Sequence, residues 1–574
     1  MNVFGKISVP IFLLLGVLPS SSQKLIRVNQ VGYRTMMPKV ATVAGMDATS
    51  FEIKENKTDE TVYKGVLEQG RYWMQSMETI QKIDFTDFDG KGIYYIQIGD
   101  EKSYPFMIAD SPFDGVLHAS LRAFYYWRAS AAIEPPYSIS KGYDFSRKLG
   151  HPDTLVFVHR SAASDGRHAE SVIAAPKGWY DAGDYNKYVV NAGITLHQLM
   201  LSYELFPEFY RNLDLNIPEN TDSLPDIYNE IKWEIDWLLA MQDPVDGGVY
   251  HKLTTLHFSR FVQPDEDDAD RYVVKKSTAA ALDFASVMAM FYRVFGKLEP
   301  NYASKTLVAA KRAWKWAEAN PKSVYNDPDD VKTGTYADDF LNDEFFWTAS
   351  ELFLATGEKS YYDKMEFFQK FETPTWRMVN TLGLIDLRLH QSELPSYVDK
   401  DWIDSKFRSV VQTVYNQFKF ASGRVALKKF VWGSNGEIAM NGVLLGLAYK
   451  VYGKPSYLEA MIANFDYLLG SNPTEYCFVS GFGSKYPKNL HDRRMFSDGL
   501  EEPIPGYLCG GANPNQVSDC GRSSYPSIAP ARSYLDENCS YSTNEIAINW
   551  NAPFVLLATL SCNLQGDNRD DKFE

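Results

Sequence analysis

Residues 224–242, LPDIYNEIKWEIDWLLAMQ, have the apolar pattern of an amphipathic helix. Four apolar side chains recur at helical spacing and fall on one stripe: Ile227, Ile231, Ile235 and Leu238. Glu230 and Glu234 lie off this stripe. A helix of this kind packs its apolar face against a core, so the stretch predicts one member of a helical domain.

The helical period begins after Ser111-Pro112, and we expect it to continue to the end of the chain. Many of the helices end at Gly, which suits the left-handed position after a helix. A long run of helices joined by Gly-, Pro- and Asp-rich loops predicts hairpins closed into an (α/α)6 barrel, with a helical solenoid as the alternative. The loops exceed what connections need, so function is expected there. Further helices are predicted over residues 278–296, 304–320, 343–357, 435–453 and 456–470.

The N-terminal part has period two instead. Tyr94, Ile96 and Ile98 fall on one face of a strand, and polar turns such as DFDGKG separate several short runs of this kind. Short strands with frequent turns are typical of a small antiparallel sandwich. Because 574 residues exceed one typical domain, we predict an all-β domain over residues 24–110 and a mainly α domain over residues 111–565.

Residues 1–22 have the layout of a secretory signal peptide, with a weakly basic start, a short apolar run and small residues. The mature protein is expected to begin near Ser22 to Lys24 and to be secreted or periplasmic. No later run reaches the roughly 18 apolar residues of a transmembrane helix. No membrane partner is therefore expected after cleavage.

Charge and composition limit the classes of molecule that the protein is expected to bind. A net charge of −15 repels phosphate backbones, so nucleic acid is not expected to bind. A neutral polymer is compatible with this charge. Aromatic residues make up 14% of the chain, which fits either a large aromatic core or sugar binding, where rings stack on the apolar face of a pyranose.

The cysteines lie towards the C-terminus: Cys477, Cys509, Cys520, Cys539 and Cys562. No C-x-x-C spacing occurs, so a zinc cluster is not expected. An exported chain permits disulfides, and Cys509 with Cys520 would close a short loop. The odd count leaves at least one cysteine unpaired.

Three segments contain residues suited to catalysis. The first, GWYDAGDYNKY over residues 178–188, places Asp181 and Asp184 three residues apart in a turn. Two carboxylates so placed can aim at one point, which suits holding and deprotonating a water molecule. The alternative is that Asp181 only caps a helix.

The second segment, YLDENCSYSTNEIAINWNAP, covers residues 534–553. Glu545 falls at the start of an apolar helical stretch, among hydroxyl, amide and aromatic side chains. A partly buried carboxyl among aromatic rings has a raised pKa, as a general acid needs near neutral pH. The alternative is a first-turn Glu that meets the helix dipole.

The third segment is a Gly-rich loop, residues 481–494, which ends in a histidine and two arginines. His491 and Arg493 alternate along an extended stretch, which suits hydrogen bonds to sugar hydroxyls. Taken alone, the pattern fits an ordinary surface His and Arg at least as well.

Together the three segments resemble glycoside hydrolase family 9, the inverting cellulases, over nearly all of residues 111–565. RVNQVGY, residues 27–33, is similar to the opening of the immunoglobulin-like module that precedes the catalytic barrel in many bacterial members. The His-x-Arg signature departs only at Cys477, where Ser, Thr or Val is usual. The signature positions that match are Val479, Ser480, Gly483, Lys485, Leu490, His491, Arg493, Tyr534, Asp536, Tyr541, Glu545, Ala547, Asn551 and Ala552.

The resemblance implies an endo-β-1,4-glucanase that cuts cellulose, mixed-linkage glucan or xyloglucan with inversion. Glu545 would be the general acid and Asp184 the general base, with the two carboxyls roughly 6.5–9.5 Å apart. Asp181 would be a second ligand of the water. The remaining residues would contact the sugar or support Glu545: His491, Arg493, Asp536 and Tyr541. The enzyme is expected to be a monomer.

The resemblance also implies further sites. Trp432, Tyr336 and Trp347 stand in motifs similar to those of the family and are candidates for lining sugar subsites, although Trp347 fits a core position equally well. No cofactor is expected for the chemistry. Asp343-Glu344 matches an acidic pair that binds structural calcium in the family, and a capping box is the alternative. The zinc-binding cysteines of some members have no counterpart here.

Two other functions remain open. An exo-acting β-glucosidase or glucosaminidase of the same family would keep both carboxyls but block one end of the cleft, and the insertions at residues 142–171 and 263–272 are candidates for such a wall. A non-catalytic glucan-binding protein would have lost the acid or the base. Both residues are present.

Overall fold

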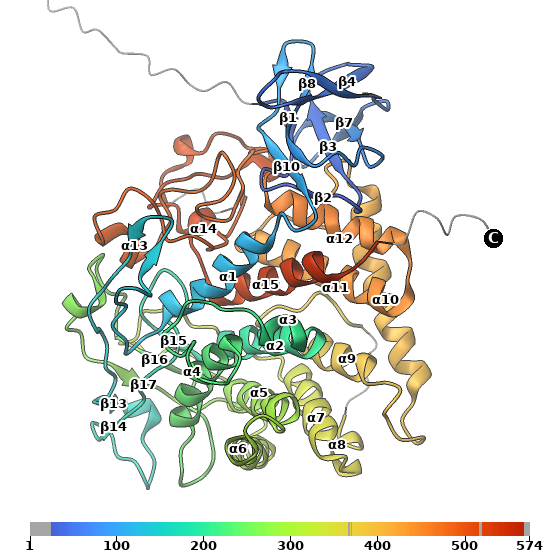
Figure 1. The fold of residues 1–574 in the computed structure, drawn as a ribbon. Coiled ribbons are helices and arrows are strands. Elements are labelled where there is room, and N and C mark those ends of the chain that lie inside the picture. Colours follow the sequence, from blue (N-terminus) through green and yellow to red (C-terminus); the bar gives the residue numbers. More distant parts are fainter. Residues whose placement is uncertain (1–23, 366–367, 369, 516–518, 567–574) are drawn as a thin grey trace, which may run out of the picture.

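The computed structural model describes residues 24–365, 368, 370–515 and 519–566. The predicted signal peptide over residues 1–22 lies outside this range. Figure 1 shows a β-rich module stacked on one end of a larger helical body. The strands of the module end at Ala109, and the first helix of the body begins at Asp114.

The N-terminal module is a sandwich of two sheets. The apolar faces of both sheets meet in a core that contains Tyr33, Phe51, Ile96 and Phe106. Tyr94, Ile96 and Ile98 are buried, as the period-two pattern predicts. One sheet has the order β1 (Ile26–Arg27), β3 (Val40–Ala44), β7 (Glu78–Asp84) and β6 (Arg71–Trp73). The other has β2 (Tyr33–Arg34), β10 (Phe106–Ala109), β8 (Gly92–Ile98), β4 (Ser50–Glu55) and β5 (Thr61–Val66), with β9 (Glu101–Lys102) on β8.

The helical body is a closed double ring (Figure 1). The last helix, α15, packs on both α11 and α2, which closes the inner ring and excludes the solenoid. Six helices form the inner ring: α2 (Val189–Leu205), α5 (Thr278–Phe295), α7 (Asn342–Thr356), α9 (Asn380–Leu389), α11 (Ser434–Tyr452) and α15 (Ile548–Asn563). The outer helices are α1 (Asp114–Trp127), α4 (Asp226–Met241), α6 (Pro300–Ala319), α8 (Lys359–Tyr362), α10 (Lys400–Phe420) and α12 (Pro455–Leu468). Short helices lie in the connections: α3 (Pro207–Arg211), α13 (Arg493–Ser497) and α14 (Tyr541–Asn544).

Burial differs between the two rings. The outer helix α10 buries a single stripe, Ile403, Phe407, Val410, Val414 and Phe418, as expected for an amphipathic helix. The inner helices are buried on nearly all sides. Among the described residues, α5 alone is long and apolar enough to cross a membrane. It packs against α2, α6 and α7, so its apolar character serves the barrel core.

Glu230 and Glu234 of α4 are fully buried despite lying off the apolar stripe. Glu230 forms an ion pair with Arg128, with 2.8 Å between Oε1 and Nη2. Glu234 accepts a hydrogen bond of 2.6 Å from the backbone N–H of Trp179. Glu230 also accepts from the Trp179 indole N–H at 3.4 Å. Both carboxylates therefore bind the GWYDAGDYNKY segment, a role that helical periodicity does not reveal.

The expectation of a helical period to the end of the chain is wrong for two regions. Residues 139–188 and 252–273 contain a hairpin of β11 (Ile139–Ser140) and β12 (Tyr143–Asp144), a small sheet and connecting loops. Most of residues 471–540 are loop. Strands of two or three residues are too short to show a period. The sheet has the order β14 (Val172–Ile173), β13 (Val156–Val158), β17 (Tyr272–Val273), β16 (Lys252–Thr254) and β15 (Lys187–Tyr188).

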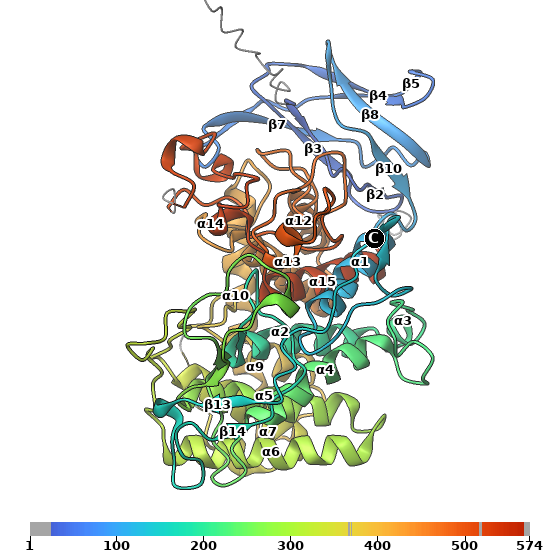
Figure 2. The ribbon, with the colours of Figure 1, turned by 90° about the vertical axis from the view of Figure 1, so that its left-hand side faces the viewer.

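The small sheet and the loops that carry α13 and α14 lie on the same side of the barrel, the left in Figure 1. This side faces the viewer in Figure 2. β15 immediately follows the GDYN turn and leads into α2. The sheet therefore positions the segment that contains both predicted base-side carboxylates.

The N-terminal module is fixed to the barrel through RVNQVGY. Asn29 donates a 2.7 Å hydrogen bond to Asp466 at the end of α12. The Gln30 amide donates to the Glu475 carbonyl over 2.6 Å, and its oxygen accepts from the N–H groups of Ser484 and Lys485. The module thus holds the start of the loop that leads to His491.

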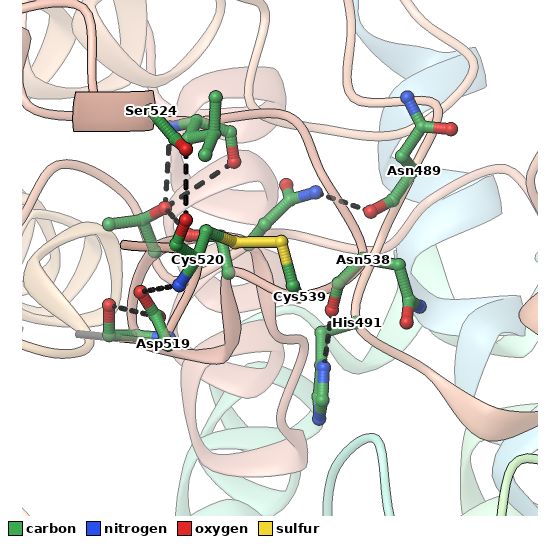
Figure 3. The surroundings of a disulfide bond; sticks show 12 residues. Asn489, His491, Asp519, Cys520, Ser524, Asn538 and Cys539 are labelled. Carbon is green, nitrogen blue, oxygen red and sulfur yellow. Dashed lines mark hydrogen bonds between the residues drawn. A yellow bond between two sulfur atoms is a disulfide. The ribbon is translucent and has the colours of Figure 1, made fainter. Parts of the chain in front are cut away.

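A disulfide joins Cys520 and Cys539, with an S–S distance of 2.03 Å (Figure 3). The pairing of Cys509 with Cys520 suggested by the sequence is therefore wrong. Cys509 is buried, free and 3.6 Å from the Tyr534 hydroxyl. The backbone of Cys509 forms a β-bridge with Ile546, a residue of the second motif. This pairing keeps Cys509 within the barrel.

Candidate active site

The three sequence motifs meet at one cavity of about 650 Å³. The first motif ends at residue 188, whereas the other two begin at residues 481 and 534, and the closed barrel brings their loops together. The predicted residues that line the cavity are Asp181, Asp184, Tyr336, Trp432, His491, Arg493, Tyr541 and Glu545. Asp536 and Trp347, also singled out from the sequence, do not line it.

Asp184 lies in the turn before β15 and is nearly fully buried. Its Oδ2 accepts hydrogen bonds from the Asn186 side chain at 2.6 Å and from the Tyr188 hydroxyl at 3.2 Å. Both donors fix the direction of this carboxyl, which lines the cavity.

Asp181 is buried beside Asp184. Its oxygens accept from the Asn191 amide at 2.9 and 3.1 Å and from the Tyr336 hydroxyl at 2.9 Å. Burial, together with the charge of Asp184, raises its pKa to about 8. Helix α2 begins at Val189 without a side-chain cap, so Asp181 is not the helix cap that the sequence left open.

Glu545 lies in an extended link between α14 and α15, at φ −71° and ψ 154°. It precedes α15 by three residues, because α15 starts at Ile548. The alternative of a first-turn glutamate is therefore wrong. Burial first, and then the charge of Asp184, raises the pKa of Glu545 well above its usual range. Such a carboxyl remains protonated near neutral pH and can donate that proton.

His491 and Arg493 connect the two carboxylate segments. The His491 Nδ1 donates to the Asn538 carbonyl at 2.6 Å. Arg493 donates to the carbonyls of Ser259 at 2.8 Å and Gly183 at 2.7 Å. A Cβ at Gly183 would lie 2.1 Å from the His491 carbonyl oxygen, so the close approach of the two loops requires glycine there.

Aromatic rings form the walls of the cavity. Trp432, 45% exposed, lies against Tyr541 with ring centres 5.4 Å apart. Tyr336 packs between Tyr188 and Trp376, at centre distances of 4.7 and 5.1 Å. Rings exposed in this way suit the apolar faces of sugar units. Trp347 is fully buried in α7, which decides in favour of its core reading.

Asp536 lies outside the cavity and acts on the backbone. It accepts from the N–H groups of Lys488 and Asn489 at 3.0 and 2.9 Å, and from the Asn544 amide at 3.1 Å. Asn544 directly precedes Glu545. The geometry therefore makes Asp536 a positioning residue for the Glu545 and His491 segments.

The acidic pair Asp343-Glu344 is buried on α7, beside Asp283 of α5 and Asp338. Asp343 accepts from the Val379 N–H at 2.8 Å. Helix α7 begins at Asn342, and Leu341 before it makes no side-chain cap, so the capping-box alternative is wrong. Several buried oxygens have no hydrogen-bond partner: both of Asp283, both of Glu344, Oδ1 of Asp343 and Oδ2 of Asp338.

A second buried group brings ligand atoms of His197, Glu351 and Asp386 within 4.8 Å of one another, a set able to hold a metal ion. Arg293 lies 3.3 Å from Glu351 and supplies positive charge there. The carboxylates around Asp343 and Asp283 are different, because within the described part of the chain their one ion pair is a 3.9 Å contact of Arg377 with Asp338.

Sequence reasoning missed several residues that line the cavity or hold Asp184. Asn186 and Tyr188 stand inside the quoted GWYDAGDYNKY segment, two and four residues after Asp184. A search for donors that hold the base would have found them. Phe258 and Trp376 also line the cavity but lie in loops without any pattern, so no sequence signal marks them.

Two family models match the chain, and together they cover most of it. The model described as Glycosyl hydrolase family 9 matches residues 113–558. The chain belongs to glycosyl hydrolase family 9. The model of the cellulase N-terminal ig-like domain matches residues 21–103. The resemblance drawn from the motifs is therefore confirmed, as are the barrel and the sandwich, and the protein is a glycoside hydrolase of this family.

Relatives of this family 9 hydrolase match over nearly their whole length. A xyloglucan-specific endo-β-1,4-glucanase of Bacteroides ovatus is 39% identical over 93% of this chain and 93% of its own. Endoglucanase D of Acetivibrio thermocellus is 32% identical over 95% of this chain and 86% of its own. A solved Bacteroides ovatus family 9 structure, 36% identical, superposes with a TM-score of 0.86 over 94% of this chain and 98% of that one.

Proposed function

We propose that this family 9 hydrolase is an inverting endo-β-1,4-glucanase with Glu545 as general acid and Asp184 as general base. The observation that carries the proposal is the arrangement of these two carboxyls in one cavity with opposite environments. Glu545 has a strongly raised pKa, whereas Asp184 is held by two hydrogen-bond donors. Two carboxyls whose environments differ in this way take opposite roles in acid and base catalysis.

The reaction follows from these positions. Glu545 gives its proton to the glycosidic oxygen as the bond to the anomeric carbon breaks. Asp184 takes a proton from a water molecule that attacks the opposite face of the same carbon. Asp181 lines the same cavity, is held by hydrogen bonds from Asn191 and Tyr336, and serves as the second ligand of the water. A single displacement inverts the anomeric centre and needs no covalent intermediate.

We propose a β-1,4-glucan backbone as the substrate, with xyloglucan as the preferred form. The relative with 39% identity is named for xyloglucan, and the exposed rings of Trp432 and Tyr541 suit stacking on successive glucosyl units. Comparison of the hydrolysis rates on equal amounts of xyloglucan, mixed-linkage β-glucan and carboxymethyl cellulose tests this preference. A rapid fall in viscosity with oligosaccharide products supports endo action. Release of single terminal sugars without a viscosity change would support the exo-acting alternative.

We also propose a structural calcium site at Asp343, Glu344 and Asp283. Calcium binds hard oxygen ligands, and carboxylates dominate its protein sites. The buried carboxylate oxygens without hydrogen-bond partners in this group fit such an ion, because unpaired buried charges are otherwise strongly destabilising. The ion would stabilise the α5–α7 contact and takes no part in bond cleavage.

Removal of calcium is expected to lower the melting temperature by about 5–10 °C. An ion at about 100 times its Kd stabilises a protein by about 2.7 kcal/mol, and each kcal/mol corresponds to about 2–4 °C in a large domain. Differential scanning calorimetry with EGTA or added calcium measures the shift, and elemental analysis measures the bound ion.

Asp283→Asn should abolish both the bound calcium and the response to EGTA. Asp339→Asn, at an exposed neighbouring position, is the matched control and should retain both. Equal melting temperatures with and without calcium in the unmodified protein would refute the site.

We propose that the chain is exported as a monomer to the periplasm or the medium. The signal-like residues 1–22 and the Cys520–Cys539 disulfide support export, because disulfides persist in oxidising compartments. Fractionation of the source cells with N-terminal sequencing tests the cleavage, and light scattering tests the monomer. A cytoplasmic protein that begins at Met1 would contradict the proposal.

A further inference from the structure

Figure 3 shows the Cys520–Cys539 disulfide next to Asn538, the residue that contacts His491. Asn538 precedes Cys539, and its main-chain carbonyl accepts the 2.6 Å hydrogen bond from His491 Nδ1. The Asn538 side chain donates to the Leu490 carbonyl at 2.9 Å. The residue next to the disulfide therefore contacts both the ring of His491 and the backbone just before it.

Asn538 lies between two exposed residues, Glu537 and Cys539. Their carbonyls accept from the N–H groups of Ser540 at 2.9 Å and Tyr541 at 3.0 Å. Further along, the Tyr525 hydroxyl bonds Ser540 at 2.7 Å, and Asp519 accepts from the Ser542 hydroxyl at 2.7 Å. These contacts join the segment around Cys520 to the segment after Cys539. The disulfide adds a covalent link between the same two segments, one residue from Asn538.

The Asn538 carbonyl determines which tautomer neutral His491 adopts. A carbonyl oxygen only accepts hydrogen bonds, so Nδ1 of His491 must carry the proton. Neutral His491 then has Nε2 free as an acceptor for a sugar hydroxyl. Phe261 and Tyr541 contact the ring at centre distances of 5.3 and 5.9 Å and restrict its tilt.

We propose that the Cys520–Cys539 disulfide is a positioning element for His491. By holding the Asn538 carbonyl, it keeps His491 in one tautomer and one orientation at the wall of the cavity. A shift of the loop at Asn538 breaks the hydrogen bond to Nδ1. The proton can then move to Nε2, which no longer accepts a hydrogen bond from the sugar. The inference rests on the proposed glucanase function, because it assigns the disulfide an effect on that reaction.

A double-mutant cycle tests this coupling. Cys520→Ser with Cys539→Ser is expected to lower kcat/KM on cello- or xyloglucan oligosaccharides by about 10-fold, since small misplacements of a binding group have effects of at least this size. In a His491→Ala background the same pair should change kcat/KM by less than 2-fold. Residues that act as a unit show such non-additive losses. Cys562→Ser, which removes a free cysteine on α15, is the matched control and should leave activity unchanged.

Each other outcome has a definite meaning. Equal losses in both backgrounds would show that the disulfide acts only on general stability, and no loss with His491 present would show that it does not position the ring. Either result overturns the inference while the unmodified enzyme remains an active glucanase. An inactive unmodified enzyme would instead refute the proposed function and, with it, this inference.

Reduction of the native protein covers the case in which the serine variants do not fold. Dithiothreitol supplies two electrons and two protons, the Cys520–Cys539 bond becomes two thiols, and the reagent becomes its cyclic disulfide. Activity should fall with the appearance of two new thiols and return on reoxidation. The His491→Ala protein should show no such change in its residual activity. Full activity after complete reduction would overturn the inference.

Discussion

Glu545→Gln is expected to lower kcat on β-1,4-glucan oligosaccharides by about 10³–10⁴-fold, because the amide keeps the shape of the carboxyl but has no proton to donate. KM should change little. The fold should remain intact, since the raised pKa of Glu545 shows that the folded protein disfavours its ionised form. The neutral variant should therefore melt at the same temperature or slightly higher at alkaline pH. Steady-state kinetics and calorimetry on the same sample measure both effects.

A substrate with a better leaving group distinguishes loss of the general acid from general damage to the active site. In a dinitrophenyl β-cellobioside, the dinitrophenolate leaving group departs without protonation. Glu545→Gln should therefore retain most of the turnover on this substrate. The unmodified enzyme needs protonated Glu545, so its activity on glucan should fall as pH rises through the raised pKa. That alkaline limb should be absent from the variant with the activated substrate. An equal loss on both substrates would show that Glu545 is not the acid.

Asp184→Asn is expected to lose a similar factor of about 10³–10⁴ in kcat, because the water then has no base. Asn keeps the size of the side chain and its contacts with Asn186 and Tyr188. Unlike the Glu545 variant, this one should be as inactive on the dinitrophenyl substrate as on glucan. Comparison of the two substrates measures this difference.

Azide supplies a direct control, since it is a nucleophile that needs no deprotonation. With Asp184→Asn it should restore turnover and give the α-glycosyl azide, the inverted product. Asp181→Asn is the matched neighbouring variant. Its loss should be smaller, because Asp184 would still deprotonate the water. Near-normal turnover by Asp184→Asn without azide would assign the base to another residue.

The sequence predicts the catalytic candidates well because their motifs are local. Asp181 and Asp184 share a turn, and Glu545 precedes a long apolar helix, so residue type and spacing already indicate their chemistry. The helices predicted over residues 278–296, 304–320, 343–357, 435–453 and 456–470 appear as α5, α6, α7, α11 and α12, because their apolar stretches are long. The stripe from Ile227 to Leu238 appears in α4 as expected.

What the sequence does not reveal depends on contacts between distant segments. Glu230 and Glu234 look like surface residues, but α4 buries them against Arg128 and Trp179. Cys520 pairs with Cys539 and not with its nearer neighbour in the chain, because the structure keeps Cys509 inside the barrel. The short strands of the small sheet are set by pairing partners and not by periodicity.

The stereochemistry of the first products tests the central claim most directly. Proton NMR of a cello- or xyloglucan oligosaccharide digest, recorded within the first minutes, resolves the two anomers before they equilibrate. Direct displacement by water, with Glu545 as acid and Asp184 as base, predicts that the α-anomer appears first. Early β-anomer would mean retention of configuration and would contradict the assigned roles of both carboxyls.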